Sequence, residues 1–170
     1  MSERLLATGR SPDLVTTTIL IEGEQIPRTC KVSQVVVDRE VNRVPTARLV
    51  LLDGDPATED FPLSNQGLFV PGKTIAIQAG YHSEEETIFE GLIVKHSIKL
   101  RANGNAALLL VCKDKAVRLT QGRKSRYFYE MKDSQVFEEI LGGYDLQASG
   151  DDTGEPHREI VQFQATDWDF

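Results

Sequence analysis

The chain has 170 residues, of which 40% are hydrophobic and 26% are charged, and its formal net charge is −7. This composition is typical of a globular chain that buries a core and forms one domain, or one domain and the start of another. The acidic balance argues against nucleic-acid binding, which needs a basic face. The sequence has no apolar run long enough for a membrane span and no signal-peptide core, so we expect the protein to be made and first assembled in a cytoplasm.

The first two thirds of the chain show the period-two alternation of β-strands. After an N-terminal tail at residues 1–13, strands are predicted at residues 14–22, 30–41, 46–52, 73–81, 87–100 and 106–112. Residues 53–70 are polar and predict a long loop, held to the core by Phe61, Leu63, Leu68 and Phe69. Because closure of a sheet removes exposed strand edges, these strands favour a mainly β fold with a closed or nearly closed antiparallel barrel over residues 14–132.

The remaining residues, 133–170, predict a short helix, a strand and the start of a second domain. The helix begins at Asp133 or Ser134 and ends at the glycine pair after residue 141. In the strand at residues 159–165, the alternation predicts that Val161, Phe163 and Ala165 point inward and that Ile160, Gln162 and Gln164 point outward. Thr166 is expected to cap a further helix, with acidic residues in its first turn, so we expect the chain to be part of a longer protein.

The cysteines, histidines and carboxylates of the chain do not show the spacing that catalysis or metal binding requires. Cys30 and Cys112 lie in strand-like runs and are expected to be buried small apolar residues, although a disulfide between neighbouring strands stays open. The histidines show no metal-ligand spacing, and no nucleophile elbow or phosphate-binding glycine loop occurs. Carboxylates at loop tips keep ordinary pKa values and rarely perform acid catalysis. The sequence therefore predicts no enzyme, metal or cofactor.

Charge is unevenly distributed in the last third of the chain. Seven Lys or Arg residues oppose two acidic ones between Lys113 and Lys132, whereas ten acidic residues oppose Arg158 alone from Asp133 to Phe170. The contrast indicates either solvated faces or complementary surfaces between protomers. Residues 122–128 mix cations with aromatic side chains and read as a basic loop that contacts an acidic protein neighbour, with a solvated loop or a single-strand nucleic-acid surface as alternatives.

The single tryptophan, Trp168, has two interpretations. It packs between the barrel and whatever follows Phe170, or it anchors a sugar or a partner. Together with the basic loop, this tryptophan gives a candidate protein interface that consists of Arg123, Lys124, Arg126, Tyr127 and Trp168.

Three segments in a fixed order carry a family resemblance. They are the run from Gly122 to Phe128, the helix opened by Asp133-Ser134 together with residues 143–146, and His157 with the V-Q-F and T-D-W-D-F runs that follow it. These segments resemble the N-terminal region of VgrG and Rhs-associated Vgr proteins, which are spike and hub components of type VI secretion and related contractile injection particles. Leu5-Leu6 and Arg10-Ser11-Pro12 look more like the spikes of extracellular, phage-tail-like particles.

The resemblance implies a tube-like barrel of the phage tail hub type, followed by a linking helix, a strand and the truncated start of a second barrel. Proteins of this kind are trimers that join a hexameric inner tube to a spike, with baseplate and spike-tip proteins as further partners. The chain lacks the small barrel and the β-helical needle that such proteins carry, so a target membrane would be reached only through the missing spike.

We therefore expect a structural spike or hub protein of a contractile injection system, which becomes part of a secreted or extracellular particle. Such an adaptor needs rigid barrels and large interfaces, and it needs no reaction centre. The alternatives are a stand-alone carbohydrate-binding barrel that uses Trp168 and Tyr144, a tube-capping module, and the hub part of a cell-wall hydrolase.

Overall fold

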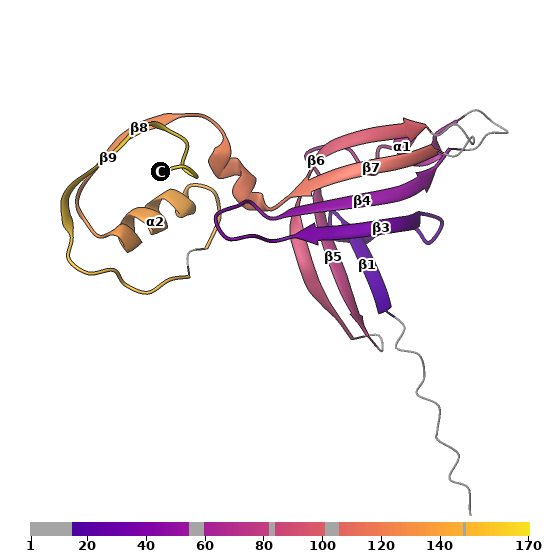
Figure 1. Ribbon diagram of the computed structural model, residues 1–170, viewed down its shortest axis with the longest axis horizontal. Coiled ribbons are helices and arrows are strands. Elements are labelled where there is room, and N and C mark those ends of the chain that lie inside the picture. Colours follow the sequence, from indigo (N-terminus) through magenta and orange to yellow (C-terminus); the bar gives the residue numbers. More distant parts are fainter. Residues whose placement is uncertain (1–14, 55–59, 82–83, 101–105, 148) are drawn as a thin grey trace, which may run out of the picture. The chain divides into compact units, whose positions relative to one another are not determined.

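The computed structural model of the chain describes residues 15–54, 60–81, 84–100, 106–147 and 149–170. The expected N-terminal tail at residues 1–13, including the segments that resemble extracellular spikes, lies outside these residues. In chain order the elements are β1 (Val15–Ile21), β2 (Glu24–Gln25), β3 (Lys31–Asp38), β4 (Thr46–Asp53), α1 (Pro62–Asn65), β5 (Thr74–Tyr81), β6 (Glu84–Leu100), β7 (Ala106–Lys113), the 3-10 helix η1 (Lys115–Thr120), β8 (Lys124–Met131), α2 (Asp133–Gly142) and β9 (His157–Ala165) (Figure 1). Within the described ranges, no helix has the length and apolar character that crossing a membrane requires.

The chain divides into two compact units. The first consists of Met1–Asp38 and Thr46–Cys112 and is called the sheet unit here. The second consists of Arg39–Pro45 and Lys113–Phe170 and is called the ribbon unit, after its two-stranded sheet. Each unit has its own apolar cluster.

The sheet unit is a seven-stranded, mainly antiparallel sheet with the order β2-β1-β5-β6-β7-β4-β3. Consecutive strands β2 and β3 stand at opposite ends of this order, although only residues 26–30 connect them. Five residues span at most about 18 Å, so the sheet must curl until its two ends lie near each other. The result is an open antiparallel barrel, which agrees with the predicted fold class.

The interior of the sheet unit is apolar. One face of each strand supplies the buried residues, as the predicted alternation requires: Ile19 and Ile21 from β1, Leu49 and Leu51 from β4, Ile75 and Ile77 from β5, and Leu108, Leu110 and Cys112 from β7. Cys30 and Cys112 are buried free thiols, as expected, and burial raises the pKa of the Cys112 thiol to about 12.

The long loop after β4 is held by a buried carboxylate that the sequence pattern did not indicate. Asp53 accepts hydrogen bonds from the backbone N–H groups of Gly54, Leu63 and Ser64 and from the Ser64 hydroxyl, over 2.7 to 3.0 Å. Burial raises the pKa of Asp53, but these hydrogen bonds outweigh burial and lower it below its usual value. Asp53 thereby fixes the short helix α1, and the predicted anchors Leu63 and Phe69 reach the core.

The regular elements of the ribbon unit are η1, the antiparallel pair β8–β9 and the amphipathic helix α2, which Figure 1 draws from orange to yellow. The helix occupies the range that the sequence predicts, but its N-cap is Lys132, whose backbone N–H donates to the Gln135 side chain over 2.9 Å. One face of the helix packs on the inner face of the ribbon, and the buried cluster is Leu119, Phe128, Val136 and Ile140.

Candidate functional site: the β8–β9 ribbon

All five residues of the candidate interface lie in the ribbon unit, on or next to β8 and in the C-terminal turn. The interpretation of residues 122–128 as a basic loop is wrong for most of its length, because Lys124 begins a strand. The register of that strand pairs Arg126 with Gln162 and Tyr127 with Val161. Its side chains therefore alternate between an inner and an outer face of the ribbon.

On the inner face, the cations converge on Asp167, a carboxylate whose side chain is fully buried. Lys124 Nζ donates to its Oδ2 over 2.7 Å, and Gln162 Nε2 donates to its Oδ1 over 2.9 Å. The Arg126 guanidinium and the Tyr144 hydroxyl also donate to this carboxylate. One acidic side chain thus collects four donors from three separate parts of the unit.

This polar cluster is connected further. Arg126 Nε donates to Gln162 Oε1 over 2.9 Å, and Lys124 Nζ donates to the Tyr144 hydroxyl over 2.8 Å. Gln162 has no exposed surface, so its side-chain amide depends on these partners. Burial alone raises the pKa of Asp167, but the hydrogen bonds from Lys124, Tyr144 and Gln162 and the charge of Arg126 outweigh burial and lower it to about 2.

The charge contrast along the sequence is thus partly resolved inside the ribbon unit. Lys124 and Arg126 pair with Asp167, and Lys132 pairs with Asp152 over 2.6 Å. Arg123 is exposed and donates to the backbone carbonyl of Gln164 over 3.2 Å. These ion pairs join the two segments within one unit, so a second protomer is not needed to balance their charges.

Trp168 packs against the apolar cluster of its own unit. Its backbone N–H donates to the carbonyl of Leu119 over 3.1 Å, and it lines an apolar groove of about 580 Å³ with Phe137 and Phe170. The Thr166 hydroxyl oxygen accepts from the Asp169 backbone N–H over 3.1 Å, as in a helix cap, but residues 167–169 form a turn rather than the predicted helix start. The sequence had no signal for the role of Asp167, because three of its four donors, Lys124, Arg126 and Tyr144, lie far away in the chain.

The outer face of the ribbon is aromatic and exposed. The rings of Tyr127 and Tyr129 stack with centroids 6.2 Å apart, and 61% of Tyr127 is exposed. Val161 lies opposite Tyr127, and Phe163, two residues further along β9, is 73% exposed. The predicted inward orientation of Val161 and Phe163 is wrong. Gln162 takes the inner position because Asp167 and Arg126 satisfy its amide there.

The outer face of the ribbon combines exposed aromatic side chains with a regular strand pair. Aromatic side chains on a rigid backbone bury large areas at little cost in conformational entropy, which is why they are enriched in protein interfaces. The polar cluster beneath connects β8 to β9 from the inside through Arg126 and Gln162. Among the described residues, no group of three or more His, Cys, Asp or Glu side chains is placed to hold a metal ion.

Sequence comparison gives one family. A family model described as the Alg8 N-terminal domain matches residues 11–170. No curated protein matches the sequence significantly.

Comparison with solved structures shows that the chain is similar to several tail proteins. The 43 kDa tail protein of prophage MuSo2 from Shewanella oneidensis is similar with a TM-score of 0.66 and 12% identity, over 90% of this chain and 45% of that chain. The E. coli c3393 protein is a type VI secretion component described as similar to the T4 bacteriophage tail proteins gp27 and gp5. It has a TM-score of 0.63 and 14% identity, over 88% of this chain and 40% of its own.

A tail protein from Neisseria meningitidis MC58 has a TM-score of 0.55 and 11% identity, over 91% of this chain and 43% of its own. The chain thus spans less than half the length of each of these three proteins. At such low identity, the shared property is the fold.

Proposed function

This chain belongs to the Alg8 N-terminal domain family, and from that membership and its fold we propose that it is a structural component of a phage-tail-like contractile injection particle. The observation that carries the proposal is the extent of the structural likeness. Close to nine tenths of the chain, including both the sheet unit and the ribbon unit, superimposes on a prophage tail protein and on a type VI secretion component.

In its finer form the proposal is a VgrG-like hub. Three copies would form an adaptor that joins the hexameric inner tube to the spike, with baseplate and spike-tip proteins as neighbours. Closed rotational symmetry is the usual arrangement of such assemblies, and rigid β units suit an adaptor that transmits force. The chain would be assembled in the bacterial cytoplasm and then become part of the injection particle.

The outer face of the ribbon is the surface that we assign to contacts within the particle. Tyr127 and the exposed Arg123 would contact the neighbouring protein directly, joined by Tyr129 and Phe163. Lys124, Arg126 and Trp168 would support that surface from inside, since they are bound to Asp167 or packed in the apolar cluster.

The role that we propose is non-enzymatic. The alternative of a carbohydrate-binding barrel rested on Trp168 and Tyr144, and both now have structural roles. Trp168 packs in the ribbon unit, and the Tyr144 hydroxyl donates to Asp167. The tube-capping module and the hub of a cell-wall hydrolase remain compatible with a structural role for these 170 residues.

The test replaces two aromatic side chains of the outer face, as the double variant Tyr127→Ser and Phe163→Ser, in the source organism. Both are exposed, so we expect a folded protein with a stability change below about 1 kcal/mol. Loss of interface aromatic residues costs about 2 kcal/mol or more each, so the variant should fall at least tenfold in abundance, relative to the inner-tube protein, in purified particles.

The matched control is Tyr81→Ser, which removes an aromatic side chain of similar exposure from the sheet unit. Its incorporation should stay within twofold of the unmodified chain. If the double variant were incorporated as well as the unmodified chain, the outer face of the ribbon would not be part of the interface. Absence of the unmodified chain from the particles would contradict the proposed function itself.

A further inference from the structure

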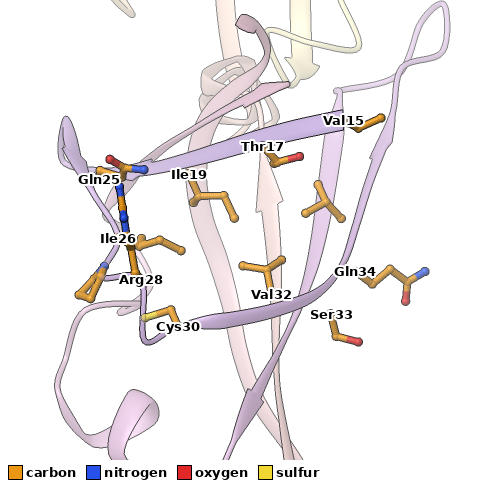
Figure 2. Close-up of a pocket in the computed structure, with 12 residues that line it drawn as sticks. Val15, Thr17, Ile19, Gln25, Ile26, Arg28, Cys30, Val32, Ser33 and Gln34 are labelled. Carbon is orange, nitrogen blue, oxygen red and sulfur yellow. The ribbon is translucent and has the colours of Figure 1, made fainter. Parts of the chain in front are cut away.

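Bulges interrupt three of the strand pairs whose register the structure describes, and in each bulge one strand has an extra residue. They lie near Ser33 of β3, Ile88 of β6 and Gln164 of β9, and the first forms part of the wall of a pocket of about 580 Å³ in the sheet unit (Figure 2). Of these three residues, Gln164 has a φ of 45°, in the left-handed region, and the other two do not have a positive φ. A side chain with a Cβ disfavours that backbone conformation, so it persists only where the surrounding contacts hold it.

The bulge in β9 is held by two side chains from the start of β8 and the turn before it. The Gln164 backbone N–H donates to the Ser125 hydroxyl oxygen over 3.2 Å, and the Arg123 guanidinium donates to the Gln164 carbonyl over 3.2 Å. The next carbonyl, that of Ala165, accepts from the Gln162 side-chain amide over 3.1 Å. Backbone groups that a regular ladder would pair across the strands are therefore bonded by side chains at the bulge.

The bulge determines which side chains of β9 face inward. Successive side chains of a strand alternate between its two faces, and an extra residue shifts that alternation by one. Gln162 lies opposite Arg126 and Ala165 lies opposite Lys124, so both face inward although they are three positions apart. Phe163 lies between them, faces outward and is 73% exposed.

A regular ladder without the bulge would reverse this arrangement over most of β9. If the strand were shifted by one residue while Ala165 kept its partner, Val161 and Phe163 would face inward and Gln162 would face outward. That is the arrangement that the alternation of the sequence predicts. The shift would also release Gln164 from its left-handed backbone. Hydrophobic pattern and backbone strain thus both favour a register that hides the apolar side chains of the outer face.

We propose that Ser125 and Arg123 are positioning residues that select the bulged register of β9, and with it the outward orientation of Val161 and Phe163. The inference rests on the proposed function, in which the outer face of the ribbon makes contacts within the particle. The polar cluster favours the same register, because it holds Gln162 on the inner face. Loss of the two bulge contacts should therefore populate the shifted register in part of the molecules.

The experiment measures the register by NMR on the 170-residue chain. Cross-strand contacts between the backbone protons of Tyr127 and Val161 report the bulged register, and contacts between Tyr127 and Gln162 report the shifted one. The unmodified chain should show the first set alone. The double variant Arg123→Met and Ser125→Ala should show the second set in about a tenth of the molecules or more. The single variant Ser125→Ala should show it more weakly.

Two further variants make the test specific to the bulge. The control Arg158→Met and Ser149→Ala removes an exposed cation and an exposed hydroxyl from other positions of the ribbon unit, and it should leave the register unchanged. Adding Gln164→Gly to the double variant should restore the bulged register, because glycine adopts a positive φ without strain. A dispersed amide spectrum shows that each variant is folded.

Three results would overturn the inference. The first is that the double variant keeps the Tyr127–Val161 contacts alone. The second is that the control shifts the register as much as the double variant does. The third is that Gln164→Gly fails to restore the bulged register. Because all three are measured on the chain outside the particle, they are independent of the incorporation experiment that tests the proposed function.

Discussion

The two units of the chain build their interiors in different ways. In the described part of the sheet unit, fifteen apolar residues are buried in one cluster, and the buried Asp53 lies at the end of β4. Among the described residues, the buried apolar side chains of the ribbon unit are Leu119, Phe128, Val136 and Ile140, and a buried carboxylate with its donors adds to them. Hydrophobic periodicity therefore describes the first unit well and fails in the β8–β9 strand pair of the second, where cations and an amide take inward positions.

The largest expected effect tests the apolar interior. Phe89→Ala on β6 removes a ring that is 1% exposed, and we expect the sheet unit to lose about 3–5 kcal/mol of unfolding free energy through lost burial and the cavity left behind. Native-state hydrogen exchange should show the loss in the amides of β5 and β6. Val94→Ala, on the same strand but 39% exposed, should cost below about 1 kcal/mol. An equal cost for the two variants would contradict a well-packed interior.

The second effect tests the polar interior. Asp167→Ala removes the carboxylate that the buried amide of Gln162 and two cations share, so we expect the ribbon unit to lose about 3 kcal/mol, measured from exchange in β8 and β9. The fluorescence of Trp168, the single tryptophan, reports the same unit. Asp151→Ala removes an exposed carboxylate from the same unit and should be neutral. An unchanged stability of Asp167→Ala would mean that the cluster is not part of the core.

The third effect distinguishes the units by pH. The pKa of Asp167 is about 2 in the folded chain against an ordinary value of 3.8, so the ionised form is stabilised by folding. This contribution, about 2 kcal/mol, is fully present above pH 4 and is lost as the pH falls toward 2. Exchange or fluorescence measured between pH 5 and 2 should show a loss in the ribbon unit that Asp167→Ala reduces to the part due to Asp152, whose pKa Lys132 also lowers. If the stability of the variant depended on pH as strongly as that of the unmodified chain, the titrating group would be one other than Asp167.

The smallest effect separates the two neighbouring cations. Lys124→Met removes one of four donors to Asp167 and keeps most of the aliphatic stem, and Lys124 is partly exposed, so we expect a loss of about 1 kcal/mol. Arg123→Met removes an exposed cation that contacts only a backbone carbonyl, and it should change the stability of the unit by below about 0.5 kcal/mol. Chemical denaturation followed by Trp168 fluorescence measures both variants. A larger loss of stability in Arg123→Met than in Lys124→Met would contradict the roles assigned to the two cations.

Much of the sheet unit could be predicted from the sequence, because its strands follow simple alternation. The segments at 14–22, 46–52, 73–81 and 106–112 match β1, β4, β5 and β7 within one residue at each end. The free, buried state of Cys30 and Cys112 follows from the same pattern. The helix α1 was not predicted, because its support is the carboxylate of Asp53, several residues earlier in the chain.

The candidate site was predicted only in part. Its residues do lie together, but the sequence pattern did not predict strand β8. Lys124 and Arg126 occupy inward positions at which the pattern of a strand leads one to expect apolar residues. A signal was present in the alternation of Lys124, Arg126 and Phe128 with Ser125, Tyr127 and Tyr129. Reading it correctly required an acidic partner for the cations. That partner, Asp167, is more than forty residues later in the sequence, and only the fold brings it near.

The measurement that tests the central claim most directly is the location of this chain in native particles. Particles purified from the source organism would be labelled with an antibody against the chain and examined by electron microscopy. If the chain is a structural hub, label should appear at one end of the inner tube, in a fixed ratio to the other components at that end. Label along the whole tube, or particles that lack the chain altogether, would contradict that role.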